Sequence, residues 1–332
     1  MRVVAALDKF RGTATAAEAC AAIGSACWER GHDACEVPMS DGGEGLLDVL
    51  GGANRTSRVT GPLGAPVEAA WRLAQRTAVI EMSRASGLQL AGGPDGNDVL
   101  QATTTGTGQL IDRALEEGAR RIVVGLGGSA TTDGGLGALE ALRSPARLRT
   151  VELEVACDVR TRFVDAAAVF GPQKGASPAQ VALLTARLAQ LAQRYADEYG
   201  VDVVELDGGG AAGGLGGALA ALGGRLVPGF ELVAEHVELD DRLAAADVVV
   251  TGEGYLDAQS LDGKVVGGVC ERATAAAVRV VVIAGDADPE VTAELTGRDG
   301  IEVISLVDRY GDERAMREPR WCIEHAAIDA LG

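Results

Sequence analysis

The chain has 332 residues, of which 47% are hydrophobic and 3% aromatic, and it carries a formal net charge of −18. A chain of this length is expected to form two compact domains with sizeable buried cores. The negative charge argues against nucleic acid or an anionic membrane surface as a partner and favours a small molecule.

Both ends of the chain alternate between apolar strands and helices. The N-terminal part predicts strands at 2–7 and 34–39 and helices at 15–31 and 44–52. The C-terminal part predicts strands at 246–252, 278–285 and 301–307 and helices at 267–277, 289–297 and 321–331. Apolar strands that alternate with helices indicate a parallel sheet buried on both faces.

The middle of the chain has a different pattern. It predicts paired strands at 63–74 and 77–83, a helix at 108–118, strands at 120–126 and 151–158, and a long helix from 178. We therefore predict an α/β fold in which a mixed α/β domain, residues 60–238, is inserted into a discontinuous parallel-sheet domain of residues 1–59 plus 239–332.

The long helix has a clear start signal. Ser177 is predicted to be the N-cap, Pro178 suits the first helical position, and Gln180 completes a capping box. The helix should bury one apolar stripe made of Val181, Leu184, Leu188, Leu191 and Tyr195.

A glycine-rich segment follows the strand at 120–126 and reads VVGLGGSATTDGGLGAL. Gly125, Gly127 and Ala130 fit a dinucleotide fingerprint, but such a fingerprint normally follows the first strand of its domain. The hydroxyl-rich second half favours a phosphate cradle at a helix start, although a simple capped turn stays open. The candidate phosphate ligands are Gly127, Gly128, Ser129, Thr131, Thr132 and Asp133.

Two further clusters place carboxylates at the ends of predicted strands. PMSDGGEG supplies Asp41 and Glu44, where open parallel sheets bind ligands. VVVTGEGYLDAQSLDGK supplies Glu253 and Asp257, which could hold Mg²⁺, and Lys264, which could neutralise a phosphoryl group. Both could also be ordinary turns with solvated charges.

Asp158 ends the strand at 151–158 and is a candidate general base for a substrate hydroxyl, unless it belongs to a structural ion pair. Of the 30 basic residues only Lys9, Lys174 and Lys264 are lysines, and all three lie in polar loops beside glycine or aspartate. An ammonium is not equivalent to a guanidinium, so these lysines are candidates for chemistry.

Several classes of site are not expected. The six cysteines form no C-x-x-C pair and the three histidines have no metal-ligand spacing, so reduced thiols and no zinc site are predicted. The chain lacks a P-loop, a G-x-S-x-G elbow and the protein-kinase motifs. With no membrane span or leader pattern, a cytoplasmic protein is expected, and a homodimer stays open.

Taken together, the motifs resemble the bacterial class I glycerate kinase family. The matching segments follow the family order and are LDKFRGTATAAEA, PMSDGGEG, VTGPLG, EMSRASGL, TTTGTGQLI, GLGGSATTDGGLGAL, ACDV, VFGPQKGA, GGGAAGGLGGAL and VVVTGEGYLDAQSLDGKVVGGV. The resemblance implies a flavodoxin-like α/β domain with a second α/β domain inserted in it. It also implies ATP-dependent phosphorylation of D-glycerate, usually at the 2-hydroxyl, giving 2-phosphoglycerate, and we expect Mg²⁺ to bridge the ATP oxygens.

The resemblance also assigns roles to individual residues. It makes Asp158 and Lys264 the candidate catalytic residues. The residues themselves add Lys174 as a candidate phosphate ligand and Glu253 and Asp257 as candidate metal ligands. The candidate substrate ligands are Asp8, Arg11, Asp41, Gly42, Gly43 and Glu44.

This chain departs from the family pattern in three places. It reads DKFRG where members usually read DSFKG, its segment before ACDV is shorter, and RTRFVDA replaces an N-P-L loop after ACDV. A kinase of another hydroxy acid or of a polyol therefore stays open. A nicotinamide-dependent oxidoreductase and a non-catalytic relative that binds a metabolite stay open as well.

Overall fold

The computed structural model describes residues 1–10 and 12–332 and divides into two compact units. Unit 1 consists of Met1–Asp41 and Gly229–Gly332, and unit 2 consists of Gly42–Pro228. These boundaries differ from the predicted 59/60 and 238/239. Residues 42–59 group with unit 2, because the strand β3 (Arg55–Thr60) pairs with β4 (Pro66–Ala74) of that unit.

Unit 1 contains a five-stranded sheet in which every pair of neighbouring strands is parallel. The strands are β1 (Arg2–Leu7), β2 (Asp33–Glu36), β9 (Val248–Leu256), β10 (Arg279–Ala287) and β11 (Ile301–Ser305), and their spatial order is β11-β10-β9-β1-β2. Numbered within the unit, the order is 2-1-3-4-5, which is the flavodoxin-like order. The predicted α/β fold class is confirmed.

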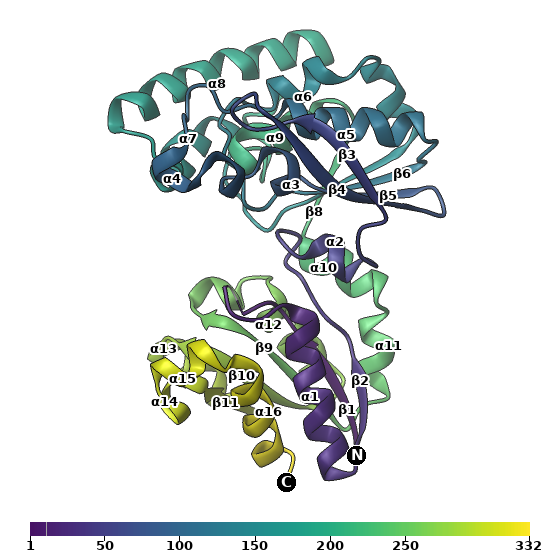
Figure 1. Cartoon of the computed structure of the whole chain (residues 1–332), viewed down its shortest axis with the longest axis vertical. Coiled ribbons are helices and arrows are strands. Elements are labelled where there is room, and N and C mark those ends of the chain that lie inside the picture. Colours follow the sequence, from purple (N-terminus) through teal and green to yellow (C-terminus); the bar gives the residue numbers. More distant parts are fainter. Residues whose placement is uncertain (11) are drawn as a thin grey trace. The chain divides into compact units, whose positions relative to one another are not determined.

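Helices cover the unit 1 sheet. Residues 3–7 of β1 are all buried, and because alternate residues of a strand point to opposite faces, both faces are covered. On one face α1 (Ala16–Arg30) and α16 (Pro319–Ala330) share a core cluster with the strands, and they lie side by side in Figure 1. The other helices are α10 (Gly229–His236), α11 (Leu239–Ala244), α12 (Val265–Ala275), α13 (Pro289–Thr296), α14 (Leu306–Tyr310) and α15 (Asp312–Arg317).

The first predicted strand and helix agree closely with the structure. Thr15 caps α1 through a capping box with Glu18, and Gly31 ends the helix in the left-handed conformation. The predicted strand at 34–39 is shorter as an element, although the N–H groups of Val37 and Met39 still donate to β1. Pro38 between them has no N–H to donate, so the regular ladder stops.

Unit 2 contains a six-stranded mixed sheet. Its strands are β3, β4, β5 (Thr77–Glu81), β6 (Arg121–Gly125), β7 (Glu152–Ala156) and β8 (Arg225–Val227), in sequential order. The β3–β4 and β4–β5 pairs are antiparallel, and the remaining pairs are parallel. The carboxyl ends of β5, β6 and β7 therefore lie at the same edge of the sheet.

The long helix of unit 2 was predicted correctly. It is α8 (Pro178–Tyr199), and Ser177 and Gln180 form the predicted capping box. Leu184, Leu188 and Tyr195 are buried on its apolar stripe. The other α-helices of unit 2 are α2 (Leu46–Val49), α3 (Ser83–Ser86), α4 (Gly93–Gly96), α5 (Thr105–Glu116), α6 (Leu136–Ala141), α7 (Ala166–Phe170) and α9 (Leu215–Ala221).

The glycine-rich segment at 207–219 is a helix-packing site rather than an open loop. It includes a 3₁₀ turn, η5 (Ala211–Gly214), and the start of α9. A Cβ on Gly217 would lie 2.5 Å from Cδ2 of the buried Phe163, so the glycine lets the aromatic ring pack directly on the helix backbone.

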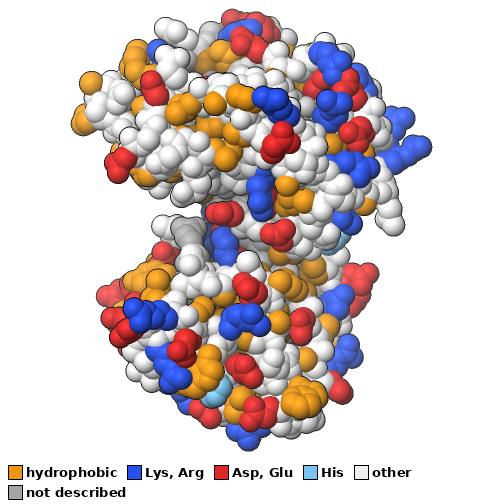
Figure 2. Space-filling view, viewed as in Figure 1, with side chains coloured by type: hydrophobic (Ala, Val, Ile, Leu, Met, Phe, Trp, Pro, Cys, Tyr) orange, Lys and Arg blue, Asp and Glu red, His pale blue; other side chains and the backbone are white. Residues whose placement is uncertain are grey.

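Charged side chains of both signs are interspersed over the face of the protein shown in Figure 2. Many of them form exposed pairs along a helix, such as Arg194 with Glu198 and Arg317 with Glu313. Exposed pairs of this kind contribute about 0.2–1 kcal/mol each, so the fold depends mainly on its cores. Within the described part of the chain, no helix combines the length and apolar character needed to cross a membrane.

Candidate active site

A cavity of about 600 Å³ lies in unit 1, at the carboxyl edge of the parallel sheet. Asp8 and Lys9, which directly follow β1, line it together with Glu253 in the carboxyl-terminal half of β9. The chain passes from β1 to β2 in one direction across the sheet and from β9 to β10 in the opposite direction. The carboxyl ends of β1 and β9 therefore form the topological switch point of the sheet. Ligands of open parallel sheets bind at such points.

Three residues near β1 form an ionic cluster in this cavity. The Nζ atom of Lys9 lies 3.4 Å from Oδ1 of Asp8 and 3.2 Å from Oδ1 of Asp41. Burial raises the pKa of Asp8 to about 6, although Lys9 opposes the rise. The structure thus joins the predicted substrate ligands Asp8 and Asp41 through Lys9, while Arg11 lies outside the described residues.

The predicted metal ligands have different surroundings. Asp257 is the N-cap of the 3₁₀ turn η6 (Ala258–Leu261), and its Oδ1 accepts hydrogen bonds from the N–H groups of Gln259 and Ser260. By contrast, Oε1 of Glu253 is buried and accepts no hydrogen bond from any described residue. Burial raises the pKa of Glu253 to about 7, and a hydrogen bond with Ser260 and the charge of nearby Lys264 oppose the rise.

Glu253 is therefore better placed than Asp257 to be a magnesium ligand, because its buried Oε1 has no partner among the described residues. Among residues 1–10 and 12–332, no three His, Cys, Asp or Glu side chains are grouped so that they could hold a metal ion. A single carboxylate is compatible with Mg²⁺, because this ion is usually bound by one or two protein carboxylates and completes its coordination with phosphate oxygens and water.

In unit 2 the glycine-rich loop of residues 126–135 follows β6. A Cβ on Gly127 would lie 2.6 Å from Cα of Gly43, and a Cβ on Gly125 would lie 2.7 Å from the carbonyl oxygen of Gly42. These glycines are therefore needed for close contact with the turn at 42–44. The contact explains the fingerprint spacing without a nicotinamide cofactor.

The hydroxyl groups of this loop differ in their partners. Oγ of Ser129 accepts a hydrogen bond from Nζ of Lys174 at 2.8 Å, and Oγ1 of Thr131 donates to the carbonyl of Ala212 at 3.4 Å. Thr132 is 2% exposed, and its Oγ1 has no partner among the described residues. A buried hydroxyl without a partner marks a place for a ligand or an ordered water.

Asp133 is hydrogen-bonded through its carboxylate to nearby backbone and side-chain groups of unit 2. Its carboxylate accepts hydrogen bonds from N and Oγ1 of Thr104, both at 2.8 Å, and from the N–H groups of Gly135 and Gly137. Burial raises the pKa of this carboxyl, whereas the hydrogen bonds lower it. These contacts hold the start of α6 against α5, which is the capping role left open by the sequence.

Lys174 is also directed into unit 2. It is 3% exposed, and besides Ser129 its ammonium donates to the carbonyl oxygen of Thr131 at 2.7 Å. Burial lowers the pKa of Lys174 to about 7, while Asp133 raises it. The geometry makes Lys174 a support for the glycine-rich loop from within the unit.

Replacing Lys174 with methionine should change how stability depends on pH. In the unfolded chain this lysine titrates near pH 10.4, so between about pH 7 and about pH 10 the unfolded chain binds more protons than the folded chain. The unfolding free energy of the wild type should therefore rise with pH relative to Lys174→Met, by up to about 1.4 kcal/mol per pH unit. Urea unfolding at several pH values measures this difference.

The matched control for this experiment is Ser129→Ala, which removes a hydrogen-bond acceptor but keeps the titrating amine. Its unfolding free energy should stay parallel to that of the wild type over the same pH range. A constant difference between wild type and Lys174→Met above about pH 7 would show that the ammonium is not desolvated in the folded state.

Sequence reasoning assigned no role to Glu81 and Arg84. Glu81, at the end of β5, is 1% exposed, and its Oε1 accepts hydrogen bonds from the N–H groups of Gly45 and Leu47, both at 2.9 Å. Its Oε2 accepts from Nε of Arg84 at 3.0 Å. This pair fixes the turn that carries Gly42, Gly43 and the exposed Glu44. The sequence did offer one signal for Glu81, since it is a charged residue that directly follows the apolar residues of β5.

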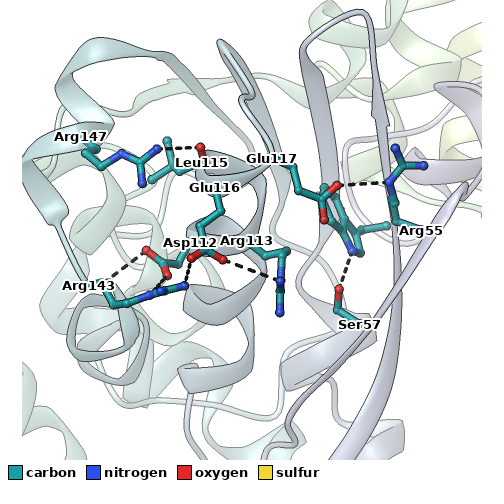
Figure 3. A network of polar contacts seen from close by, with 10 residues as sticks. Arg55, Ser57, Asp112, Arg113, Leu115, Glu116, Glu117, Arg143 and Arg147 are labelled. Carbon is teal, nitrogen blue, oxygen red and sulfur yellow. Dashed lines mark hydrogen bonds and ion pairs between the residues drawn. The ribbon is translucent and has the colours of Figure 1, made fainter.

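The shortened segment between α6 and β7 is tied to α5, as Figure 3 shows. Arg143 binds Asp112 with Nε 2.7 Å from Oδ2, and it also contacts Glu116. Arg147 donates to the carbonyl oxygen of Leu115 at 2.7 Å. Two arginines thus anchor the chain just before the strand that leads to Asp158.

Asp158 lies two residues beyond the end of β7 and is partly exposed. The N–H of the preceding Cys157 donates to the carbonyl of Val227 at 3.0 Å, which extends the pairing with β8 to the sheet edge. The carboxyl ends of three neighbouring strands of unit 2 thus carry Glu81, which ends β5, the glycine-rich loop, which follows β6, and Asp158, which follows β7. The other predicted catalytic residue, Lys264, belongs to unit 1 and precedes α12.

Comparisons with known proteins converge on one family. The model of the glycerate kinase family matches residues 3–145 and 143–331. The chain is 38% identical to glycerate 2-kinase from Escherichia coli strain K12, over 92% of this chain and 90% of that protein. It is 39% identical to glycerate kinase from Bacillus subtilis strain 168, over 86% of this chain and 85% of that protein.

A solved structure gives the same result. The crystal structure of glycerate kinase 2 from Salmonella typhimurium LT2 matches with a TM-score of 0.79 and 34% sequence identity. The match covers 100% of this chain and 98% of that chain, so it includes the sheets of both units.

Proposed function

Since this chain belongs to the glycerate kinase family, and is therefore a phosphotransferase with an alcohol acceptor, we propose that it transfers the γ-phosphoryl group of ATP to the 2-hydroxyl group of D-glycerate. The proposed products are 2-phosphoglycerate and ADP. The choice of hydroxyl is supported by the similarity to the Escherichia coli protein named glycerate 2-kinase, which extends over most of this chain.

In the proposed mechanism the carboxylate of Asp158 accepts the proton of the acceptor hydroxyl. The hydroxyl oxygen then forms a bond to the γ-phosphorus, while the bond from that phosphorus to the β-phosphate oxygen breaks and ADP leaves with the electron pair. A carboxylate at a strand end, with support from the β8 pairing behind it, is held in place for this role. Phosphoryl transfer otherwise needs positioning and charge neutralisation.

Lys264 supplies charge neutralisation in this proposal. It occupies the N-cap position of α12, and its charge lowers the pKa of the neighbouring Glu253 carboxyl against the effect of burial. A mobile ammonium can follow a phosphoryl group as its charge redistributes. Bound Mg²⁺ would be held by Glu253 and would screen the negative charge on the phosphate oxygens.

The glycine-rich loop is proposed to bind an anionic group of the reactants. The buried hydroxyl of Thr132 is the polar atom of the loop that still needs a partner, and Lys174 and Asp133 hold the backbone around it. On this basis the ligand side of the loop consists of its backbone N–H groups and Thr132, whereas the two charged residues have a supporting role.

The activity test is an assay of ADP release from Mg-ATP with D-glycerate as the acceptor. Turnover with D-glycerate and a phosphorus NMR spectrum of 2-phosphoglycerate would support the proposal. L-glycerate, glycolate, tartronate and glycerol are the comparison acceptors. Faster turnover with one of these would move the acceptor to another hydroxy acid or a polyol, and no ADP release with any of them would contradict a kinase.

A further inference from the structure

The unit 1 cavity is larger than a three-carbon acid requires. Its volume of about 600 Å³ falls in the middle of the range of about 300–1,000 Å³ that pockets for larger organic ligands occupy. Residues from the ends of β1, β9 and β10 and from the helices α14 and α15 line it. The size indicates a ligand with more than one chemical part.

The lining of the cavity has two kinds of chemistry. In the part formed by β9 and α12, and among the described residues, the buried Oε1 of Glu253 accepts no hydrogen bond and Lys264 forms no ion pair. Lys264 also precedes the N-terminus of an eleven-residue helix, where backbone N–H groups favour anions. This part suits phosphate oxygens together with a cation.

The part formed by α14 and α15 is mainly apolar, with Asp312 of α15 as its one charged side chain among the described residues. Val307 of α14 and Ala315 and Met316 of α15 line it, and Tyr255 of β9 adds an aromatic ring to the lining. Met316 is 63% exposed and Tyr255 is 55% exposed, so two large apolar side chains border the cavity without being covered. Apolar groups around a cavity are typical of sites for a flat or bulky uncharged group.

Acidic residues dominate the polar lining. Among the described residues the cavity has six acidic side chains and two lysines, and Lys9 is already paired with Asp8 and Asp41. An anionic ligand therefore needs Lys264 and a bound cation to offset these like charges. In dinucleotide-binding folds a carboxylate near a strand end accepts a hydrogen bond from a ribose hydroxyl. Oδ1 of Asp286, in β10, accepts a hydrogen bond from the adjacent N–H of Ala287, and its Oδ2 has no hydrogen bond with any residue that the structure describes.

We propose that this cavity binds the nucleotide, with the base against Val307 and Met316, the ribose hydroxyls at Asp286, and the phosphates toward Lys264. This assignment rests on the proposed function, because it takes ATP as the phosphoryl donor. It differs from the sequence prediction, which gives the nucleotide to Gly127–Asp133 in unit 2.

The test is calorimetric titration of the full-length protein with ADP in buffer that contains Mg²⁺. Asp286→Asn should weaken ADP binding by about 10-fold or more, because it removes a charged hydrogen-bond acceptor. Met316→Ala should weaken it several-fold. The matched controls are Asp299→Asn, an exposed aspartate of unit 1, and Trp28→Ala, an exposed aromatic on α1, and both should bind ADP like the wild type.

A second ligand separates ribose recognition from a general disturbance. 2′-Deoxy-ADP should bind the wild type more weakly than ADP does, but should bind Asp286→Asn as well as ADP does. The ribose contact would be overturned if Asp286→Asn lowered the affinity for 2′-deoxy-ADP as much as it lowers the affinity for ADP. Unchanged ADP affinity in both Asp286→Asn and Met316→Ala would overturn the whole assignment.

The failures of the two proposals differ. If ATP is turned over with D-glycerate and only Thr132→Ala weakens ADP binding, the nucleotide belongs to the glycine-rich loop and this assignment is wrong, while the proposed function stands. If the wild type neither binds ADP nor releases it from ATP with any acceptor, the proposed function fails and this assignment fails with it.

Discussion

Replacing Asp158 with asparagine should lower kcat by about 10²- to 10⁴-fold at saturating ATP and D-glycerate, the range that general acid–base catalysis contributes. The amide has nearly the shape of the carboxylate but cannot accept the hydroxyl proton. KM values should change much less than kcat, because Asp158 is proposed to act on the proton rather than to bind the substrate. Steady-state measurement of ADP release gives both quantities.

The control variant is Asp165→Asn, which changes an aspartate of the same connection between β7 and α7. It should keep wild-type kinetics. Both variants should also unfold at the temperature of the wild type, so that a loss of rate is not a loss of fold. Near-normal kcat for Asp158→Asn would mean that another group takes the proton.

Replacing Gly213 with alanine should destabilise the protein by several kcal/mol. Gly213 has φ of +69°, and a Cβ there would overlap the carbonyl oxygen of Thr131. The left-handed conformation costs about 1–2 kcal/mol for an alanine, and forcing extra volume into a packed site costs about 1–3 kcal/mol more. Urea unfolding followed by circular dichroism measures the loss.

Gly223→Ala is the matched control, because Gly223 also has positive φ, +96°, but the nearest atom to its Cβ, Cγ of Arg149, lies 4.0 Å away. It should show only the conformational cost. Gly213→Ala should in addition weaken activity, since Thr131 and Thr132 would be displaced. Equal destabilisation by the two substitutions would show that the contact with Thr131 relaxes without cost.

The parts of the fold that follow from local chemistry were predictable from the sequence. Ser177 and Thr15 cap their helices because the residues that form each capping box are close in the chain. The apolar runs of β1, β9 and β10 identify a buried parallel sheet for the same reason. Even the discontinuity of this sheet could be inferred, because the same pattern occurs at both ends of the chain.

The elements that were missed have weaker local signals. β3 has the sequence RTSRVT, and because it lies at the sheet edge and pairs only with β4, it carries few apolar residues. The helices α10 and α11 are only eight and six residues long, so they show little periodicity. The predicted helix at 44–52 is reduced to Leu46–Val49, because the glycines on both sides do not favour a helix.

The residue types at the candidate site were predictable, but their partners were not. Asp257, Asp133 and Glu253 are all carboxylates near glycines, yet the first two are used by their own turns and the third is not. Lys174 was expected to face a ligand, but it supports a loop from inside. Such differences depend on contacts between segments far apart in the chain, which a single sequence does not encode locally.

The inserted arrangement of unit 2 has a consequence for biosynthesis. Unit 2 is a continuous segment, so all of it is synthesised before β9 is translated. Val3 of β1, however, pairs with Val248 of β9, so the central pairing of unit 1 must wait until the whole of unit 2 has been made. Translation adds about 5–20 residues per second, which gives unit 2 time to fold first. The segment that is synthesised first therefore belongs to the unit that is completed last.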